Sequence, residues 1–238
     1  MSVRKNIPNA LTCGNLIMGC VAIEFAVECN FEMALVCMII SAVFDFFDGM
    51  AARALDAHSP IGKDLDSLAD MVSFGVSPAL IFSYGMDCGI TGNRFLIFLP
   101  LLIAAFSALR LAKFNIDPRQ ATTFIGLATP ANALFVASLF CTSKFYPGIW
   151  HFWHTVPWML GILAVGLSLL LVSEIPMFSF KFKDFTWKDN SLRFVFLGIV
   201  VVEGLASLVF GWRWSAVVFL AFASYIILNL LLLIKKRA

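Results

Sequence analysis

Apolar stretches of nearly the length of a membrane-spanning helix follow one another along the whole chain. A helix crosses the hydrocarbon core of a bilayer with about 20 residues. Of the 238 residues, 61% are hydrophobic and 13% are charged, whereas soluble domains have about 45–50% and 25%. The pattern predicts an all-α fold: a polytopic membrane helix bundle of about eight transmembrane helices, in a single domain over residues 1–238. The expected spans are residues 9–28, 32–54, 65–86, 95–113, 128–142, 155–173, 193–210 and 214–234. The fifth is the shortest, and six spans remain if one hairpin is only interfacial.

The basic residues between these spans fall mostly on one side of the membrane. With the N-terminus in the cytoplasm, the outer side receives only Arg94, Lys144 and Arg213 of the 17 Lys and Arg residues. Cytoplasmic loops carry such an excess of positive charge, so both chain ends are expected in the cytoplasm. The formal net charge of +2 gives no sign of nucleic-acid binding.

The six cysteines show no paired spacing of the kind that binds metals, and most lie in apolar segments. Buried, inert thiols are therefore expected. Cys29, Cys88 and Cys141 are expected near the outer face, where a disulfide between two of them is left open.

Four aspartates interrupt the apolar pattern at one predicted hairpin. Asp45 and Asp48 are three residues apart, and Asp66 and Asp70 are four apart, so each pair shares one helix face. Ser59-Pro60 provides a helix cap and a first-turn proline, which predicts that the second helix turns back on the first. An ionisable group inside a bilayer helix costs about 2.5–3.5 kcal/mol. We therefore expect the four acids to face each other at the cytoplasmic side for a functional reason.

Carboxylates without His or Cys among them are hard oxygen ligands, which suit Mg²⁺ or Mn²⁺ better than zinc or copper. One divalent ion offsets part of the repulsion between four acids, and two balance it. Such two-metal sites usually act on phosphoryl groups. Gly49 and Gly62 leave room for a phosphate near the backbone, Arg53 can hold a phosphate oxygen, and Ser59 can add a hydroxyl.

Buried salt bridges and ion transport are the alternatives to a metal site for these acids. The acids could pair with Arg53, Lys63 and Arg110, but the basic groups beside the motif are too few to neutralise four acids. They could line the path of a divalent-cation or phosphate-compound transporter, but transporter carboxylates tend to be scattered near the bilayer midplane. The clustering at one hairpin favours a metal site.

The acid segment resembles a known family motif. All its fixed positions match the signature of the CDP-alcohol phosphotransferases (CDP-alcohol phosphatidyltransferase class I): Asp45-x2-Asp48-Gly49-x2-Ala52-Arg53-x8-Gly62-x3-Asp66-x3-Asp70. The resemblance implies a six-helix catalytic core, usually in a homodimer, with its site open to the cytoplasmic leaflet. It also implies a divalent-metal-dependent reaction in which an alcohol replaces the CMP of a CDP-linked donor.

Flanking segments are similar to one branch of that family. Residues 7–15, 62–78, 110–115 and 124–132 resemble the integral-membrane phosphatidylserine synthases of bacteria and archaea, although Ala128 stands where proline is more usual. This branch implies a prokaryotic inner membrane and the attack of the L-serine hydroxyl on CDP-diacylglycerol, giving phosphatidylserine and CMP. Glycerol 3-phosphate or an inositol phosphate is the alternative acceptor, but a dianion should demand several basic residues at its pocket.

The resemblance also assigns roles by position. It implies that the metal ligands are Asp45, Asp48, Asp66 and Asp70, with Asp70 also the general base. The residues implied for CDP-diacylglycerol binding are Asn9, Thr12, Gly49, Arg53 and Ser59. For the carboxylate and ammonium of serine, charge and resemblance together point to Arg110, Lys113, Asn115 and Arg119.

Overall fold

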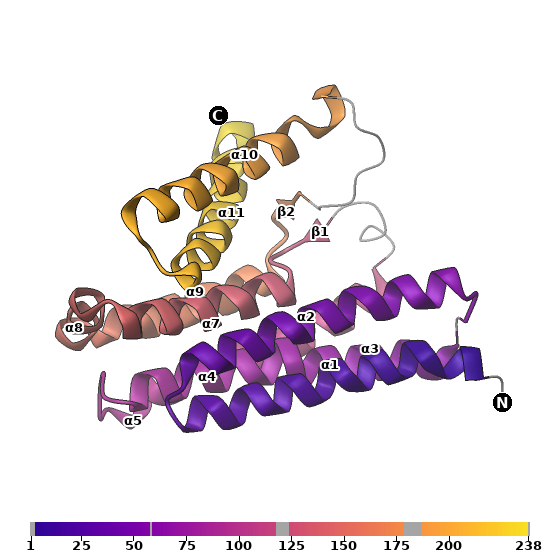
Figure 1. Cartoon of the computed structure of the whole chain (residues 1–238), viewed down its shortest axis with the longest axis horizontal. Helices are drawn as coiled ribbons and strands as arrows, with labels where there is room; N and C mark the ends of the chain where they lie inside the picture. The colour runs from indigo at the N-terminus through magenta and orange to yellow at the C-terminus, as the bar shows by residue number, and fades with distance from the viewer. Residues whose placement is uncertain (1–2, 58, 118–123, 179–186, 238) are drawn as a thin grey trace.

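A computed structural model of the chain describes residues 3–57, 59–117, 124–178 and 187–237, and nearly all of them are helical (Figure 1). The helices are α1 (Val3–Val27), α2 (Phe31–Ala54), α3 (Pro60–Asp70), α4 (Ser77–Asp87), α5 (Arg94–Phe98), α6 (Leu101–Ile116), α7 (Thr129–Phe145), α8 (Pro147–Thr155), α9 (Pro157–Val172), α10 (Trp187–Phe210) and α11 (Trp214–Arg237). A π-helical segment, η1 (Met71–Val76), joins α3 to α4 without a break. Two short strands, β1 (Phe124–Ile125) and β2 (Pro176–Met177), form an antiparallel pair.

The prediction of a polytopic membrane helix bundle is confirmed. Within the described ranges, six helical stretches are long and apolar enough to cross a bilayer, and α8 with α9, bent by 91° at their junction, make a seventh if they count as one span. The span predicted at 128–142 forms α7, whose 17 residues extend about 25 Å. That length falls short of a hydrocarbon core of about 30 Å, so the expected eight spans become six or seven by length and composition.

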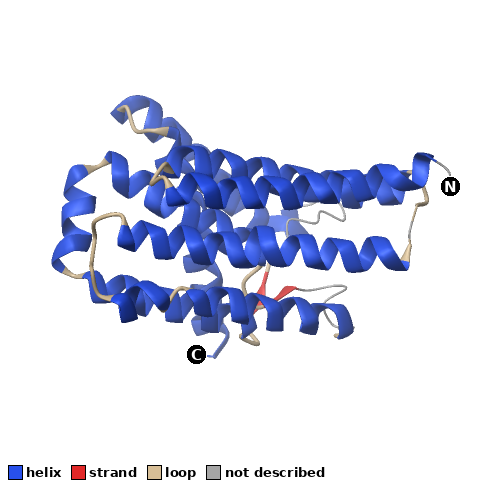
Figure 2. Cartoon of the chain, turned by 90° about the horizontal axis from the view of Figure 1, so that it is seen from below, coloured by secondary structure: helices blue, strands red, loops and turns tan. Residues whose placement is uncertain are grey.

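The helices lie in layers along the long axis of the molecule (Figure 1). α1, α2 and the α3–η1–α4 stretch run side by side, α7 packs on α2 and α4, and α6 packs on η1 and α4. α9 lies against α6, and α11 lies on the outer side of α7 with α10 beside it. The two views agree that the N-terminus and the turn between α2 and α3 share one end of the bundle (Figure 2). The two carboxylate-bearing segments are therefore brought to the same end as the N-terminus.

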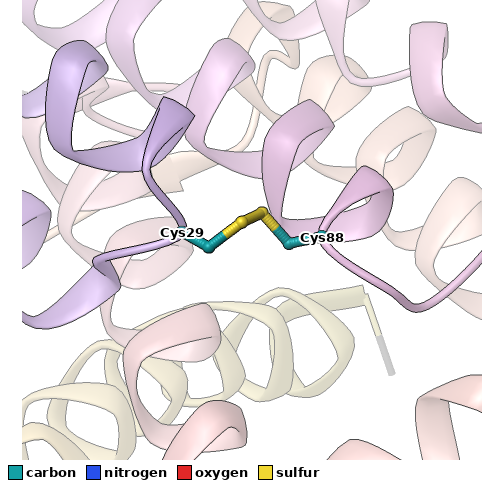
Figure 3. The surroundings of a disulfide bond; sticks show 2 residues. All are labelled: Cys29 and Cys88. Carbon is teal, nitrogen blue, oxygen red and sulfur yellow. A yellow bond between two sulfur atoms is a disulfide. The ribbon is translucent and has the colours of Figure 1, made fainter.

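The opposite end is closed by a disulfide and an aromatic cluster. Cys29, in the turn between α1 and α2, is bonded to Cys88 at the end of α4, with 6.1 Å between their Cα atoms (Figure 3). The Phe140 ring packs 5.8 Å from the Phe31 ring and 4.9 Å from the Phe82 ring, measured between centroids. Cys141 is a buried free thiol. Of the three cysteines left open by the sequence, the bonded pair is thus Cys29 and Cys88.

The start of α7 is fixed by a close backbone approach at Gly126. This residue has a φ of +76°, and a Cβ on it would lie 3.0 Å from the carbonyl oxygen of Ser173. Only glycine adopts this conformation readily and leaves the required space. The next amide, that of Leu127, donates a 2.9 Å hydrogen bond to the Leu170 carbonyl at the end of α9. These contacts place the first turn of α7 against the rest of the bundle.

Candidate metal and phosphate site

The turn between α2 and α3 has the cap that the sequence predicts. The Ser59 hydroxyl accepts a 3.0 Å hydrogen bond from the Gly62 amide, and Pro60 is the first residue of α3. The preceding turn is closed by the Ala57 amide, which donates a 3.0 Å bond to the Ala52 carbonyl. The chain therefore reverses between the two motif halves and brings α3 back along the bundle.

Three of the four motif acids converge on one point. Carboxylate oxygens of Asp45, Asp48 and Asp66 all lie within 4.8 Å of one another. The fourth acid, Asp70, adjoins Asp45 and interacts with it directly. Asp48 is buried, with 5% of its surface exposed, and the other three are half-buried. The predicted confrontation of the two carboxylate faces is thus present in the folded chain.

Among the residues that the structure describes, no Lys or Arg side chain lies within ion-pair distance of these four acids. Neither Arg53 nor Lys63 nor Arg110 forms an ion pair with any of the acids there. Close carboxylates in a partly buried site repel each other strongly. An all-oxygen donor set of this kind fits a hard divalent cation, so the three converging aspartates could hold one.

Two residues of α1 donate hydrogen bonds to the acids. The Thr12 hydroxyl lies 2.7 Å from Asp48 Oδ2, to which it donates, and the Asn15 amide donates a 3.2 Å bond to Asp70 Oδ1. Asn15 is fully buried, and its own Oδ1 accepts from the Ser41 hydroxyl on α2. Its backbone carbonyl accepts a 3.0 Å bond from Ser73 in η1. Asn15 therefore ties α1, α2 and η1 together beside Asp70.

Asn15 belongs to the site, although its sequence context marks it only as part of a flanking segment. One signal could have identified it. It is an amide in an apolar span, three residues after Thr12 and so on the same helix face. Polar residues at such positions usually face the interior of a bundle and a partner there.

A cavity of about 240 Å³ opens between α1, α2 and α3 beside the acids. Asp48 and Asp66 reach its wall, and Lys63 adds a cation that the signature motif does not include. The cavity is also lined by all five residues predicted to bind the nucleotide-linked donor: Asn9, Thr12, Gly49, Arg53 and Ser59.

The glycine of α3 is required by the packing at this cavity. A Cβ on Gly62 would lie 3.0 Å from Ser59 Oγ and 3.2 Å from Asn9 Oδ1. Contacts of that length force a neighbour to shift, so a larger residue would disturb both the cap and a cavity-lining side chain. At Gly49, by contrast, an added Cβ would meet only Arg53 Nη1 among the described residues, at 3.6 Å.

The predicted acceptor residues on α6 are placed differently from one another. Arg110 is buried, donates a 3.3 Å bond to the Thr129 hydroxyl and interacts electrostatically with Asp70. Asn115 is exposed and donates a 2.9 Å bond to Ser67, the residue after Asp66. Lys113 is also exposed, and it shares with Arg110 a cavity of about 20 Å³. Arg119 lies outside the described residues.

The sequence of the chain also matches known proteins. The sequence model of the CDP-alcohol phosphatidyltransferase family matches residues 5–171. Three relatives carry the name CDP-diacylglycerol–serine O-phosphatidyltransferase. The one from Bacillus subtilis is 36% identical over 176 residues, 74% of this chain and 91% of the relative. The one from Helicobacter pylori strain J99 is 34% identical over 207 residues, 84% of both chains. The one from Mycobacterium tuberculosis strain H37Rv is 36% identical over 179 residues, 72% of this chain, and the match spans 60% of that longer relative.

Proposed function

The chain belongs to the CDP-alcohol phosphatidyltransferase family, and on that premise we propose that it is a CDP-diacylglycerol–serine O-phosphatidyltransferase. The names of the bacterial relatives support serine as the acceptor and CDP-diacylglycerol as the donor. The observation that carries the proposal is the meeting of three aspartates of α2 and α3 beside a cavity. Two of these aspartates, Asp48 and Asp66, line the cavity together with every residue predicted to bind the donor.

The cavity offers suitable groups for a nucleotide diphosphate. Arg53 and Lys63 present positive charge, and the side chains of Asn9 and Ser59 present hydrogen-bonding groups at the same wall. A guanidinium matches two phosphate oxygens at once. We assign the diphosphate to the basic side of this cavity, near Gly49, and the cytidine to the side formed by Asn9 and Thr12.

The acids would hold Mg²⁺ or Mn²⁺, in two ions if Asp70 shares in the coordination, and bound ions would offset negative charge on the diphosphate and on departing CMP. The protein's own groups do the rest. Asp70 accepts the proton of the serine hydroxyl, whose oxygen forms a bond to the phosphorus that carries the diacylglycerol. The bond from that phosphorus to the bridging oxygen breaks and CMP leaves. Asn15 keeps the Asp70 carboxyl in place through its amide.

The acceptor pocket supports serine over a dianionic alcohol. Among the described residues, Arg110 is the one buried cation on the α6 side of the acids. A single guanidinium matches the single carboxylate of an amino acid. Glycerol 3-phosphate or an inositol phosphate carries two negative charges and would need more cations than the described part of this pocket supplies.

The test is CMP release from CDP-diacylglycerol by purified protein in lipid nanodiscs, with each acceptor supplied singly. L-Serine with Mg²⁺ or Mn²⁺ should give CMP and phosphatidylserine in equal amounts, and a chelator should stop both. Release of CMP with glycerol 3-phosphate or an inositol phosphate but not with serine would contradict the proposal that serine is the acceptor. Flux of a divalent cation or phosphate compound into vesicles without any CMP would support a transporter instead.

We also propose that the chain lies in the inner membrane of a prokaryotic cell with this site facing the cytoplasm, and that it functions as a homodimer. The excess of Lys and Arg on one side of the predicted spans supports the orientation. The disulfide at the far end supports it too, because disulfides persist in oxidising compartments outside the cytoplasm.

A further inference from the structure

Asn132, in the first turn of α7, is a buried amide without a hydrogen-bond partner in the described ranges. None of its surface is exposed, and neither Nδ2 nor Oδ1 has a hydrogen-bond partner among the described residues. Buried polar side chains nearly always find partners, so each unsatisfied one calls for an explanation. In the sequence, Asn132 stands out only as part of a flanking segment and has no predicted role.

The buried guanidinium of Arg110, which reaches the same turn of α7, also has hydrogen-bonding capacity that the described residues do not satisfy. Its side chain is 5% exposed, its Nε has no hydrogen-bond partner among the described residues, and its Nη1 donates to Thr129. It stacks over the Phe114 ring, with 5.8 Å from Cζ to the ring centroid. A buried guanidinium is expected to pair with an anion, and Arg110 forms no ion pair in the described part of the chain.

These two side chains converge on the beginning of α7. Thr129 and Asn132 are three residues apart and so lie on one face of that helix, and the bond from Arg110 to Thr129 brings the guanidinium to this turn. The N-cap residue, Ala128, offers no side-chain cap to the free amides. The first turn of a 17-residue helix favours a negative group. Three independent features therefore point to an anion at this position.

The location relative to Asp70 identifies the kind of anion. Arg110 interacts electrostatically with Asp70, the proposed proton acceptor, so the anion would lie on the α6–α7 side of the acids. The donor cavity is bounded instead by α1, α2 and the start of α3. The unpaired atoms of Asn132 also differ in kind, because its amide nitrogen donates and its amide oxygen accepts. A zwitterionic amino acid offers a carboxylate to the first and an ammonium to the second.

We propose that Arg110, Asn132 and the first turn of α7 form the subsite that binds the carboxylate and ammonium groups of the acceptor amino acid, an inference that rests on the proposed function. The Arg110 guanidinium and the Asn132 Nδ2 group hold the carboxylate, and Asn132 Oδ1 accepts from the ammonium. The hydroxyl of the same molecule then points toward Asp70. The subsite selects an amino acid over an amino alcohol that lacks the carboxylate.

The experiment compares wild type with Asn132→Leu, which removes both polar atoms and keeps the branched shape of the side chain. The kinetic constants are measured in nanodiscs for L-serine, for ethanolamine and for CDP-diacylglycerol. We expect the KM for serine to rise about 10- to 100-fold, in keeping with the loss of hydrogen bonds to charged groups. The KM for CDP-diacylglycerol should stay within about twofold, and the preference for serine over ethanolamine should shrink by a similar factor.

A matched control is available on the same helix. Thr142 is also buried, and its hydroxyl has no hydrogen-bond partner among the described residues, but it lies near the other end of α7. Thr142→Val should leave the KM for serine unchanged. Because Asn132→Leu replaces an unsatisfied polar group by an apolar one, its thermal unfolding midpoint should not fall.

A second variant guards against misfolding. Asn132→Asp keeps the size of the side chain and the oxygen that faces the ammonium group, but its charge repels the carboxylate of serine. The KM for serine should therefore rise far more than the KM for ethanolamine. A purely structural role would not separate the two acceptors.

The outcomes separate the two proposals. Wild-type activity with serine, combined with an unchanged serine KM in both Asn132 variants, overturns the subsite alone. A rise in the KM for CDP-diacylglycerol instead of serine also overturns it and assigns the anion site to a donor phosphate. Wild-type protein that makes no CMP with serine overturns the proposed function and this subsite with it.

Discussion

Thr12 and Asn15 show how single side chains of α1 act on the acids of two other helices. Each donates one hydrogen bond to a carboxylate, to Asp48 and Asp70 respectively. Residues that orient metal ligands in this way typically change metal affinity or activity by about 10- to 100-fold when removed. The two donors therefore belong to the proposed site, although they come from outside the motif.

The first prediction at this scale concerns Thr12→Val, which keeps the shape of the side chain and removes the donor to Asp48. We expect the Mg²⁺ or Mn²⁺ concentration for half-maximal CMP release to rise about 10-fold or more. Thr155→Val is the control, since in the described part of the chain that exposed hydroxyl donates only to the Phe152 carbonyl within α8. Equal metal dependence in Thr12→Val and wild type would show that the hydrogen bond from Thr12 to Asp48 does not contribute to metal binding.

The second prediction concerns Asp70→Asn, which removes the proposed proton acceptor while keeping an acceptor oxygen for Asn15. Turnover should fall by about 10²- to 10⁴-fold, the usual contribution of a general base. Binding of the cytidine nucleotide should stay measurable by titration calorimetry, because the donor cavity is bounded by other residues. Asp64, on the same helix, is exposed, so Asp64→Asn should turn over at the wild-type rate. Retained turnover in Asp70→Asn would eliminate this residue as the base.

At the scale of elements, the contact between α1 and η1 sets the position of Asp70. A Cβ on Gly19 would lie 2.7 Å from the Ser73 Cα, so the two segments touch backbone to backbone. Ser77 reinforces the contact by donating a 2.8 Å bond to the Gly19 carbonyl. η1 begins at the residue after Asp70, and π-helical turns occur often at functional sites. Its placement against α1 keeps Asp70 beside Asn15.

Gly19→Ala tests this contact. The added methyl group must push η1 away from α1, which should destabilise the protein by about 1–3 kcal/mol and lower kcat, because Asn15 and Asp70 separate. The measurement is the thermal unfolding midpoint together with CMP release. Gly204→Ala in α10 is the matched control, because an added Cβ there meets nothing within 4 Å. If both variants unfold at the same temperature as wild type, the close approach does not position the site.

At the scale of the whole molecule, the two ends of the bundle are chemically different. One end carries the turn between α2 and α3, beside which the acids and the donor cavity lie. The other end carries the turn between α1 and α2, where Cys29 is bonded to Cys88 (Figures 1 and 3). The six or seven candidate spans between them imply that the two ends face opposite sides of the membrane.

Thiol labelling in intact cells tests this orientation. Ile61, 72% exposed at the start of α3, marks the acid end. In a chain whose native cysteines are replaced, Ile61→Cys should react with a membrane-impermeant maleimide only after the inner membrane is opened. In the native chain, Cys29 and Cys88 should react from outside the cell once they are reduced. Labelling of Ile61→Cys in intact cells would invert the proposed topology.

Features that depend on local periodicity could be predicted from the amino-acid sequence. Apolar runs fixed the helical, membrane-spanning fold, and spacings of three and four put each acid pair on one helix face. The Ser59-Pro60 cap fixed the turn between them, as the bond from the Gly62 amide confirms. These properties need only neighbouring residues, so they can be derived without knowing how helices pack.

Tertiary structure alone decided the contacts between distant segments. Three features depend on which helix faces meet. They are the choice of Cys29 and Cys88 among three cysteines, the hydrogen bonds of Thr12 and Asn15 to acids 36 and 55 residues away, and the burial of Asn132. The same is true of the 91° bend between α8 and α9 and of the π-helical η1. Helix faces in an apolar bundle look alike in sequence. Close approaches such as those at Gly19 and Gly126 select one packing, because the missing Cβ at a glycine lets its backbone touch the backbone of another segment.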